Sequence, residues 1–193
     1  MNYNELKTLV QEARTTRRFK KDSSVSFEDL REILDLARIT SSAKNVQPIK
    51  YILVTKKEDV LKLSTTAAWA AHLKEWDQSE DERPSAFILM LNDRMIDGFP
   101  MFDAGASFTA ISLAAKAKGL STCPMASINK ELCKELFVIP DSFDVMIGIA
   151  VGVGVEKVEL VDAKNGDTNY YRLEDQTHCV PKRTLDQIII GEY

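Results

Sequence analysis

Apolar residues recur in two different patterns along this chain. Apolar residues stand at every third or fourth position in residues 3–13 and 30–37, which is typical of amphipathic helices. Ser26 can cap the second helix, and Asp29 at its third position favours the same start. Four short apolar runs, at residues 51–54, 86–91, 122–126 and 145–155, predict buried β-strands.

Four further helices are expected between and after these runs. Residues 57–76 carry apolar side chains at helical spacing, and the alanine-rich residues 103–118 end at Gly119, a suitable left-handed C-cap. Asn129 can cap a helix that runs through Leu136, and Thr184 with Gln187 forms a capping box near the C-terminus. The alternation of strands and helices by itself favours an α/β sheet domain.

Glycines at 148, 152 and 154 stand in the last apolar run. Their spacing is not that of a dinucleotide-binding loop, and no helix is expected after them. We therefore expect these glycines to permit tight packing of the sheet.

Length and composition set the class of protein. With 193 residues, 45% of them hydrophobic and 28% charged, the chain predicts a single globular domain over residues 1–193. The net charge of −4 argues against nucleic acid or an anionic membrane as a partner. The first residues lack a secretory pattern and no apolar run approaches the length of a membrane span, so we expect a cytoplasmic protein.

The cysteines and histidines give no sign of a metal site. Cys123, Cys133 and Cys179 are widely spaced and odd in number, which predicts three free thiols. The two histidines, His72 and His178, are far apart in the sequence, and we expect no bound metal.

Two polar segments are dense in groups that could hold a phosphorylated planar cofactor. Residues 14–19 combine guanidinium groups with hydroxyls, which can grip a phosphate. Residues 41–48 combine serines with an asparagine and a glutamine before Pro48. The alternatives are solvated cations at the end of a helix for the first segment, and an Asx-type loop that starts a strand for the second.

These segments resemble two signatures of the nitroreductase family, whose members are FMN enzymes that work as intertwined homodimers. Residues 13–19 are similar to the family's Arg-Arg-Ser-x-Arg-x-Phe, and residues 42–48 to its Ser-x-x-Asn-x-Gln-Pro. Residues 103–123 and 180–185 match further family segments in the same order. The resemblance implies an α+β fold, with a mixed, largely antiparallel sheet flanked by helices in place of a parallel one.

The resemblance also implies which residues bind FMN. In the first segment these are Arg14, Thr15 and Arg17, whereas Ala13 stands where the family commonly has an arginine, so Lys182 or Arg183 could supply the missing charge. The residues of the loop that reaches the cofactor across the dimer are Ser41, Ser42, Asn45 and Gln47. Asn45 offers a donor and an acceptor, which suits the mixed edge of an isoalloxazine ring.

A third group follows Cys123. In family members the backbone at this place lies against the flavin and directs an amide at its N5, and the matching residues here are Pro124, Met125, Ala126 and Ser127. An amide donor at N5 would stabilise negative charge on the reduced ring. For Met125 and Ala126 a place at a strand end in the core is an equal alternative, and for Cys123 a buried structural thiol is favoured over a redox role.

Aromatic residues mark a possible roof over the substrate. Trp69, His72, Phe99 and Phe102 lie in the segment that varies most within the family and often covers the substrate pocket. A slot of aromatic side chains would suit planar acceptors. However, Trp69, His72 and Trp76 also recur at helical spacing, which core packing would explain equally well.

The sequence thus predicts an FMN-dependent NAD(P)H oxidoreductase in which hydride passes from NADH or NADPH through flavin N5 to a small aromatic, nitro or quinone-like acceptor. No catalytic side chain is required, because the flavin carries the chemistry. Two alternatives remain: a flavin reductive dehalogenase or dehydrogenase for one metabolite, and a flavin-binding protein without turnover.

Overall fold

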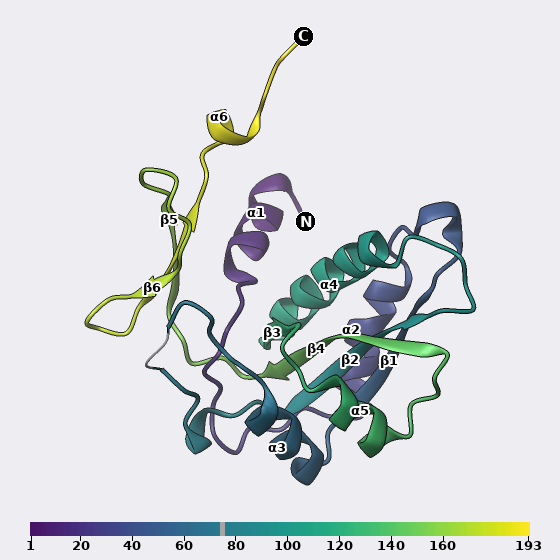
Figure 1. Ribbon diagram of the computed structural model, residues 1–193. Helices are drawn as coiled ribbons and strands as arrows, with labels where there is room; N and C mark the ends of the chain where they lie inside the picture. The colour runs from purple at the N-terminus through teal and green to yellow at the C-terminus, as the bar shows by residue number, and fades with distance from the viewer. Residues whose placement is uncertain (74–75) are drawn as a thin grey trace.

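The computed structural model describes residues 1–73 and 76–193, and its centre is a four-stranded antiparallel sheet (Figure 1). The strand order is β1-β2-β4-β3, with β1 and β3 at the two edges. The strands are β1 (Ile49–Val54), β2 (Ala86–Asp93), β3 (Ser121–Met125) and β4 (Phe143–Gly152). The four predicted strands are confirmed, and their antiparallel pairing gives the α+β class instead of the α/β class that alternation suggested.

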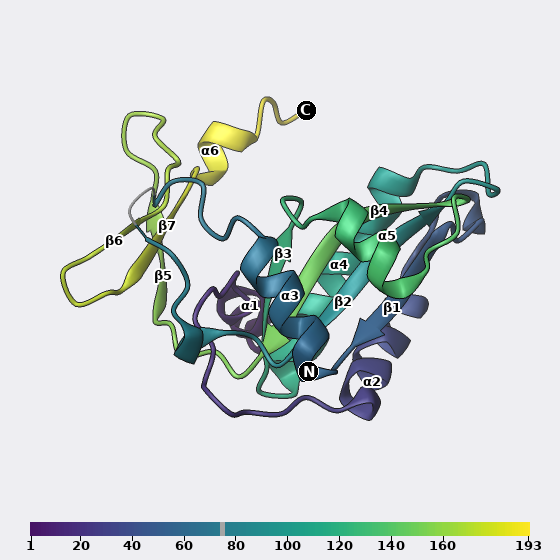
Figure 2. The same ribbon diagram turned by 60° about the horizontal axis from the view of Figure 1, so that its bottom comes forward.

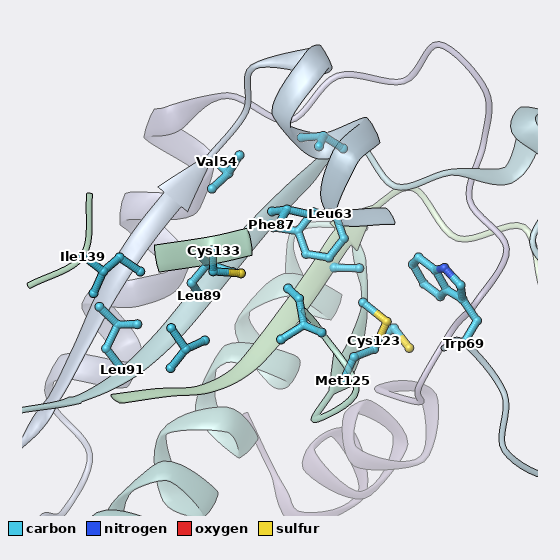
Figure 3. Packing of buried hydrophobic residues seen from close by; sticks show 14 of the residues in the cluster. Val54, Leu63, Trp69, Phe87, Leu89, Leu91, Cys123, Met125, Cys133 and Ile139 are labelled. Carbon is cyan, nitrogen blue, oxygen red and sulfur yellow. The ribbon is translucent and has the colours of Figure 1, made fainter. Parts of the chain in front are cut away.

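Helices cover both faces of this sheet. α2 (Phe27–Arg38) and α4 (Pro100–Ala117) pack on one face, and α3 (Lys57–Thr66) and α5 (Lys130–Phe137) on the other (Figure 2). Successive residues of β2 point to opposite faces, so Ile88 joins the core under α2 and α4, whereas Phe87 and Leu89 join the core under α3 and α5 (Figure 3). Burial on both sides explains why β2 is an uninterrupted apolar run.

The glycines of β4 are places of close packing, as expected. A Cβ on Gly148 would lie 2.3 Å from Cδ1 of Ile128, and one on Gly152 would lie 2.9 Å from Cδ1 of Phe19. Any larger residue would force these neighbours apart.

Side-chain caps set where several helices begin. α1 (Tyr3–Glu12) starts with a capping box between Asn2 and Glu5. Ser26 caps α2 as predicted, and its bonds with Asp29 complete a capping box there. The Asn129 side chain accepts from the amide of Leu132 at the start of α5, which confirms that cap. α4 ends at Ala117, and Gly119 takes a positive φ of 74° just beyond it.

The predicted helix over residues 57–76 is wrong in its second half, because α3 ends at Thr66. The hydroxyl of Thr66 donates to the carbonyl of Lys62, and Ala67 is already extended. The indole Nε1 of Trp69 donates to the carbonyl of Ser64 over 2.9 Å and so satisfies a carbonyl in the last turn. Trp69 therefore ends the helix and does not lie on it, so its spacing to His72 and Trp76 is not a helical one.

A smaller sheet and a projecting arm follow β4. β5 (Val158–Asp162), β7 (His178–Lys182) and β6 (Tyr171–Arg172) are adjacent in that order, and β5 and β7 are parallel. The arm, residues 184–193, contains α6 (Leu185–Ile188), which begins with the predicted capping box. It extends away from the rest of the chain (Figures 1 and 2). No helix in the described ranges has the length and apolar character needed to cross a bilayer.

Candidate functional site

The arginine segment lies along the β3 edge of the central sheet. The amide of Thr16 donates to the carbonyl of Thr122 over 2.9 Å, and Thr15 forms a parallel bridge with Thr122. Phe19 is fully buried and pairs with Gly154. These backbone contacts fix the segment beside the first residues of β3.

Arg17 is buried within a set of specific partners. Its Nε donates to the carbonyl of Trp69 over 2.7 Å, and its Nη1 lies 3.3 Å from Nε2 of His178. The guanidinium also lies over the ring of Tyr170, 4.6 Å from the ring centroid. Arg17 thus places a positive charge at the β3 edge, held by contacts that leave little of its side chain exposed.

A buried acid balances part of this charge. The side chain of Glu156 has no exposed area, accepts from the amide of Arg17 over 2.8 Å, and pairs with Arg172. Its Oε1 lies 3.9 Å from Nδ1 of His178. Because a guanidinium can only donate, Nε2 of His178 must accept from Arg17, which places the proton of the neutral ring on Nδ1.

The environment of His178 opposes its protonation. Burial lowers its pKa, and the charges of Arg17 and Arg172 add to this effect although Glu156 acts against it. We therefore expect His178 to be neutral at pH 7.

Trp69 and His72 both lie close to the cluster formed by Arg17, Tyr170 and His178. Trp69 is buried and packs in the core with Cys123 and Met125 (Figure 3). His72 is exposed and meets the ring of Tyr170 edge-on at 4.8 Å between centroids. The segment that carries both is also held at Ala68, whose carbonyl accepts from the hydroxyl of Ser127 over 2.7 Å.

The four residues after Cys123 divide between core and surface. Met125 is 4% exposed and belongs to the core, whereas Ala126 and Ser127 are exposed just beyond the end of β3. Burial raises the pKa of the Cys123 thiol to about 12, although the charge of Arg17 opposes this. All three cysteines are free, as predicted, and all three are buried; Cys123 has the properties of a structural thiol.

Arg14 lines a pocket of about 500 Å³ that also includes Lys116 and three acidic residues, Glu12, Glu156 and Glu159. Its Nη2 donates to the carbonyl of Val10 over 2.6 Å, but its Nε has no partner among the described residues. Lys182 and Arg183 are exposed at and just after the end of β7, where the arm begins, and neither lines this pocket. Within the described part of one chain, the structure does not bring them to Arg14.

The polar loop before β1 has an unusual backbone. Lys44, Asn45 and Gln47 have positive φ angles of 53°, 55° and 54°. The hydroxyl of Ser42 accepts from the amide of Gln47 over 3.0 Å and donates to the buried carboxylate of Asp103 over 2.6 Å. Nε2 of Gln47 donates to the main-chain oxygen and to Oδ1 of Asn45.

Phe99 and Phe102 lie with this loop and not with Trp69. Phe99 precedes α4, and its ring is 5.9 Å from the ammonium group of Lys44. A Cβ on Gly98 would lie 2.8 Å from Val46, so the backbone before α4 closely approaches the loop. Both phenylalanines are more than half exposed, at 56% and 68%.

The predicted site residues therefore form two groups. The arginine half-site, at the β3 edge, consists of Arg14, Thr15, Arg17, Trp69, His72 and residues 124–127. The loop half-site, at the β1 edge, consists of Ser41, Ser42, Asn45, Gln47, Phe99 and Phe102. Because β2 and β4 lie between them, β1 and β3 are three strand spacings, or about 14 Å, apart, and the two half-sites lie at opposite edges of the sheet in one chain.

Sequence reasoning missed the residues that hold these groups in place. Asp103 lies in a segment that stands out only by its family resemblance, and no local pattern marks Glu156, Tyr170 or Arg172. A carboxylate in the first turn of an alanine-rich helix was the one available signal. The bond from Arg17 to Glu156 spans 139 residues and the bond from His72 to Tyr170 spans 98, so nothing in their local sequence indicates them.

Comparison with known proteins assigns the family. The nitroreductase family profile matches residues 10–153, and the chain belongs to this family. MhqN of Bacillus subtilis, provisionally named an NAD(P)H nitroreductase, is 28% identical over 181 residues, which cover 77% of this chain and 88% of that protein. A protein of Archaeoglobus fulgidus, provisionally named NADH dehydrogenase/NAD(P)H nitroreductase, is 25% identical over 154 residues. The alignment covers 76% of this chain and 84% of that protein.

Solved structures agree on the fold. A nitroreductase family protein from Clostridium difficile 630 superposes with a TM-score of 0.67 at 22% identity, covering 100% of this chain and 99% of its own. An FMN-dependent nitroreductase from Clostridium difficile R20291 gives a TM-score of 0.64 at 22% identity, covering 82% and 91%. At these identities the likeness establishes the shared architecture.

Proposed function

We propose that residues 1–193 form one flavin-binding domain and that the protein is a homodimeric, FMN-dependent NAD(P)H oxidoreductase. Family membership and the FMN and NAD(P)H named for its relatives support this reading. The observation that carries it is the separation of the two half-sites to opposite edges of the sheet. A cofactor that needs both must lie between the arginine half-site of one copy and the loop half-site of another.

The groups present in the two half-sites fit FMN. The Nε of Arg14 is a buried donor without a partner in the described residues, which suits a phosphate oxygen. In the loop, the bonds from Gln47 to Asn45 leave an amide nitrogen and an amide oxygen for other partners, as the mixed edge of a flavin requires. The exposed residues Ala126 and Ser127 offer a surface for the ring.

When bound, FMN would take a hydride from NADH or NADPH at N5 and deliver it to a second small molecule, a nitroaromatic or quinone-like acceptor, in a ping-pong reaction. The chain's own part is to bind and to orient. Arg17 supplies a fixed positive charge that would stabilise negative charge developing nearby. The exposed rings of Phe99 and Phe102 in the loop half-site would exclude water and favour planar substrates, whereas Trp69 is buried in the core and would support the site from behind.

Exposed apolar surface supports a dimer. The arm carries Leu185, Ile188 and Ile190 with 68%, 58% and 95% of their surface exposed. A groove of about 1070 Å³ runs along the open edge of β1 and is bordered by α2 and the polar loop. The groove has a mixed polar and apolar lining, whereas the arm is an exposed apolar surface of the kind that marks a contact, and a second copy of the chain would cover it.

The first test is the visible absorption spectrum of the protein after incubation with FMN and gel filtration, followed by anaerobic addition of NADH and NADPH. Retained chromophore that bleaches with either nicotinamide is the expected result. Chromophore that stays oxidised with both would favour a flavin-binding protein. Flavin that is reduced only by a saturated metabolite would favour the dehydrogenase alternative, and reduced flavin that is reoxidised only by a halogenated metabolite would favour the dehalogenase. No retained flavin would contradict the proposal.

A further inference from the structure

Asp103 is a buried carboxylate in the first turn of α4, and both of its oxygens serve the polar loop. Oδ2 accepts from the hydroxyl of Ser42 over 2.6 Å, and Oδ1 accepts from the amide of Ala43 over 2.9 Å. Asp103 is only 4% exposed, and no described cation forms an ion pair with it. Burying a charge is costly unless hydrogen bonds compensate for the lost water, and the bonds from Ser42 and Ala43 provide that compensation.

The loop that Asp103 holds is conformationally demanding. Lys44, Asn45 and Gln47 all take left-handed φ angles, which are unfavourable for residues with a Cβ, although asparagine tolerates them best. Such backbone persists only where the surroundings determine it. The two bonds to Asp103 fix the start of the turn, and the bond from the amide of Gln47 to Ser42 closes it.

We propose that Asp103 is the positioning residue of the loop half-site: through Ser42 it holds the turn that presents the side chains of Asn45 and Gln47 to the cofactor. This inference rests on the proposed function, because it assigns the loop to FMN. Asp103 does not itself touch the cofactor in this account. Its effect on binding is exerted through the shape of the loop.

The substitution Asp103→Asn separates this role from general packing. It keeps the size of the side chain but replaces one acceptor with a donor, so either Ala43 or Ser42 loses its acceptor. Ser107→Ala is the matched control. Ser107 is one turn further along α4, equally buried, and its hydroxyl bonds to Tyr51 of β1 and not to the loop.

The experiment measures FMN affinity by quenching of flavin fluorescence and hydrogen exchange of the peptide covering residues 41–48, for wild type, Asp103→Asn and Ser107→Ala. We expect Asp103→Asn to weaken FMN binding by about tenfold or more and to speed exchange in that peptide of the apo protein, while Ser107→Ala changes neither.

Unchanged FMN affinity in Asp103→Asn would overturn the proposal. Weaker FMN binding without faster hydrogen exchange in residues 41–48 would also overturn it, because that result would indicate a direct electrostatic effect of Asp103 on the cofactor. Failure of the wild type itself to bind FMN would contradict the proposed function. That outcome is told apart from failure of the Asp103 role because it appears before any variant is compared.

Discussion

The Nε of Arg17 donates a 2.7 Å hydrogen bond to the main-chain carbonyl of Trp69, and this bond joins the arginine segment to the chain that follows α3. The same carbonyl could not be reached if residues 67–73 continued the helix. The bond therefore links two predicted site residues that are 52 positions apart.

Replacing Arg17 with methionine should lower the free energy of unfolding by about 2 kcal/mol, because the Trp69 carbonyl and Nε2 of His178 would remain buried without a donor. Urea unfolding measures this loss. Arg18→Met is the control, since the Arg18–Glu82 pair is partly exposed and should contribute less than about 1 kcal/mol. Equal losses would show that the Arg17 contacts contribute no more to stability than a partly exposed ion pair.

The position of His178 predicts sensitivity to mild acid. Its folded pKa is below the ordinary value of 6.5, so the unfolded chain binds more protons as pH falls through 6.5, and stability declines in that direction. The variant His178→Gln keeps an acceptor for Arg17 but cannot titrate.

Between pH 7.5 and 5.5, wild type should therefore lose more stability than His178→Gln, by a difference on the order of 1 kcal/mol. Chemical denaturation at the two pH values measures the difference, and His72→Gln, at an exposed position, serves as the control. The same pH dependence in wild type and His178→Gln would contradict the assignment of a neutral buried His178.

The cysteines should be unreactive in the folded protein. Burial raises the pKa of Cys123 to about 12 and that of Cys133 to about 11, so almost no thiolate is present at pH 8. A disulfide reagent such as DTNB should modify all three thiols rapidly in urea and only slowly in buffer. Fast reaction of one thiol in buffer would identify an accessible cysteine that this structure does not contain.

The arm should control assembly. Deleting residues 184–193, or changing Ile188 and Ile190 to aspartate, removes exposed apolar side chains that a second copy would bury. Light scattering should then report a monomer with lower FMN affinity, whereas wild type should be a dimer. A wild type that is monomeric at micromolar concentration, or a truncated chain that remains dimeric, would contradict this role.

How far the sequence predicts this structure depends on the range of the interactions. The strands and capped helices are set by neighbours in sequence, and residues such as Ser26 and Asp29 therefore indicated them correctly. The helix expected over residues 57–76 was wrong because the indole of Trp69 turns back to Ser64 and its ring enters the core, a tertiary contact that periodicity does not show.

The same limit applies to the site. The two polar segments were recognisable because their residue types are unusual, but their placement at opposite edges follows from the strand order β1-β2-β4-β3, which residue patterns do not specify. Likewise, the bond from Ser42 to Asp103 joins residues 61 positions apart and became visible only in the folded chain.

The central claim, a cofactor shared between two chains, is tested most directly with heterodimers purified through two different tags. Ala126→Trp blocks the arginine half-site at an exposed position, and Asn45→Gly with Gln47→Gly removes two loop side chains at positions whose positive φ suits glycine. In one heterodimer the two defects are on different chains, and in the other both are on one chain beside a wild-type partner.

A shared site predicts about one FMN in the first heterodimer, because the two intact half-sites meet there, and none in the second. The reverse result, with no FMN in the first heterodimer and about one in the second, would place the whole site within a single chain and contradict the account.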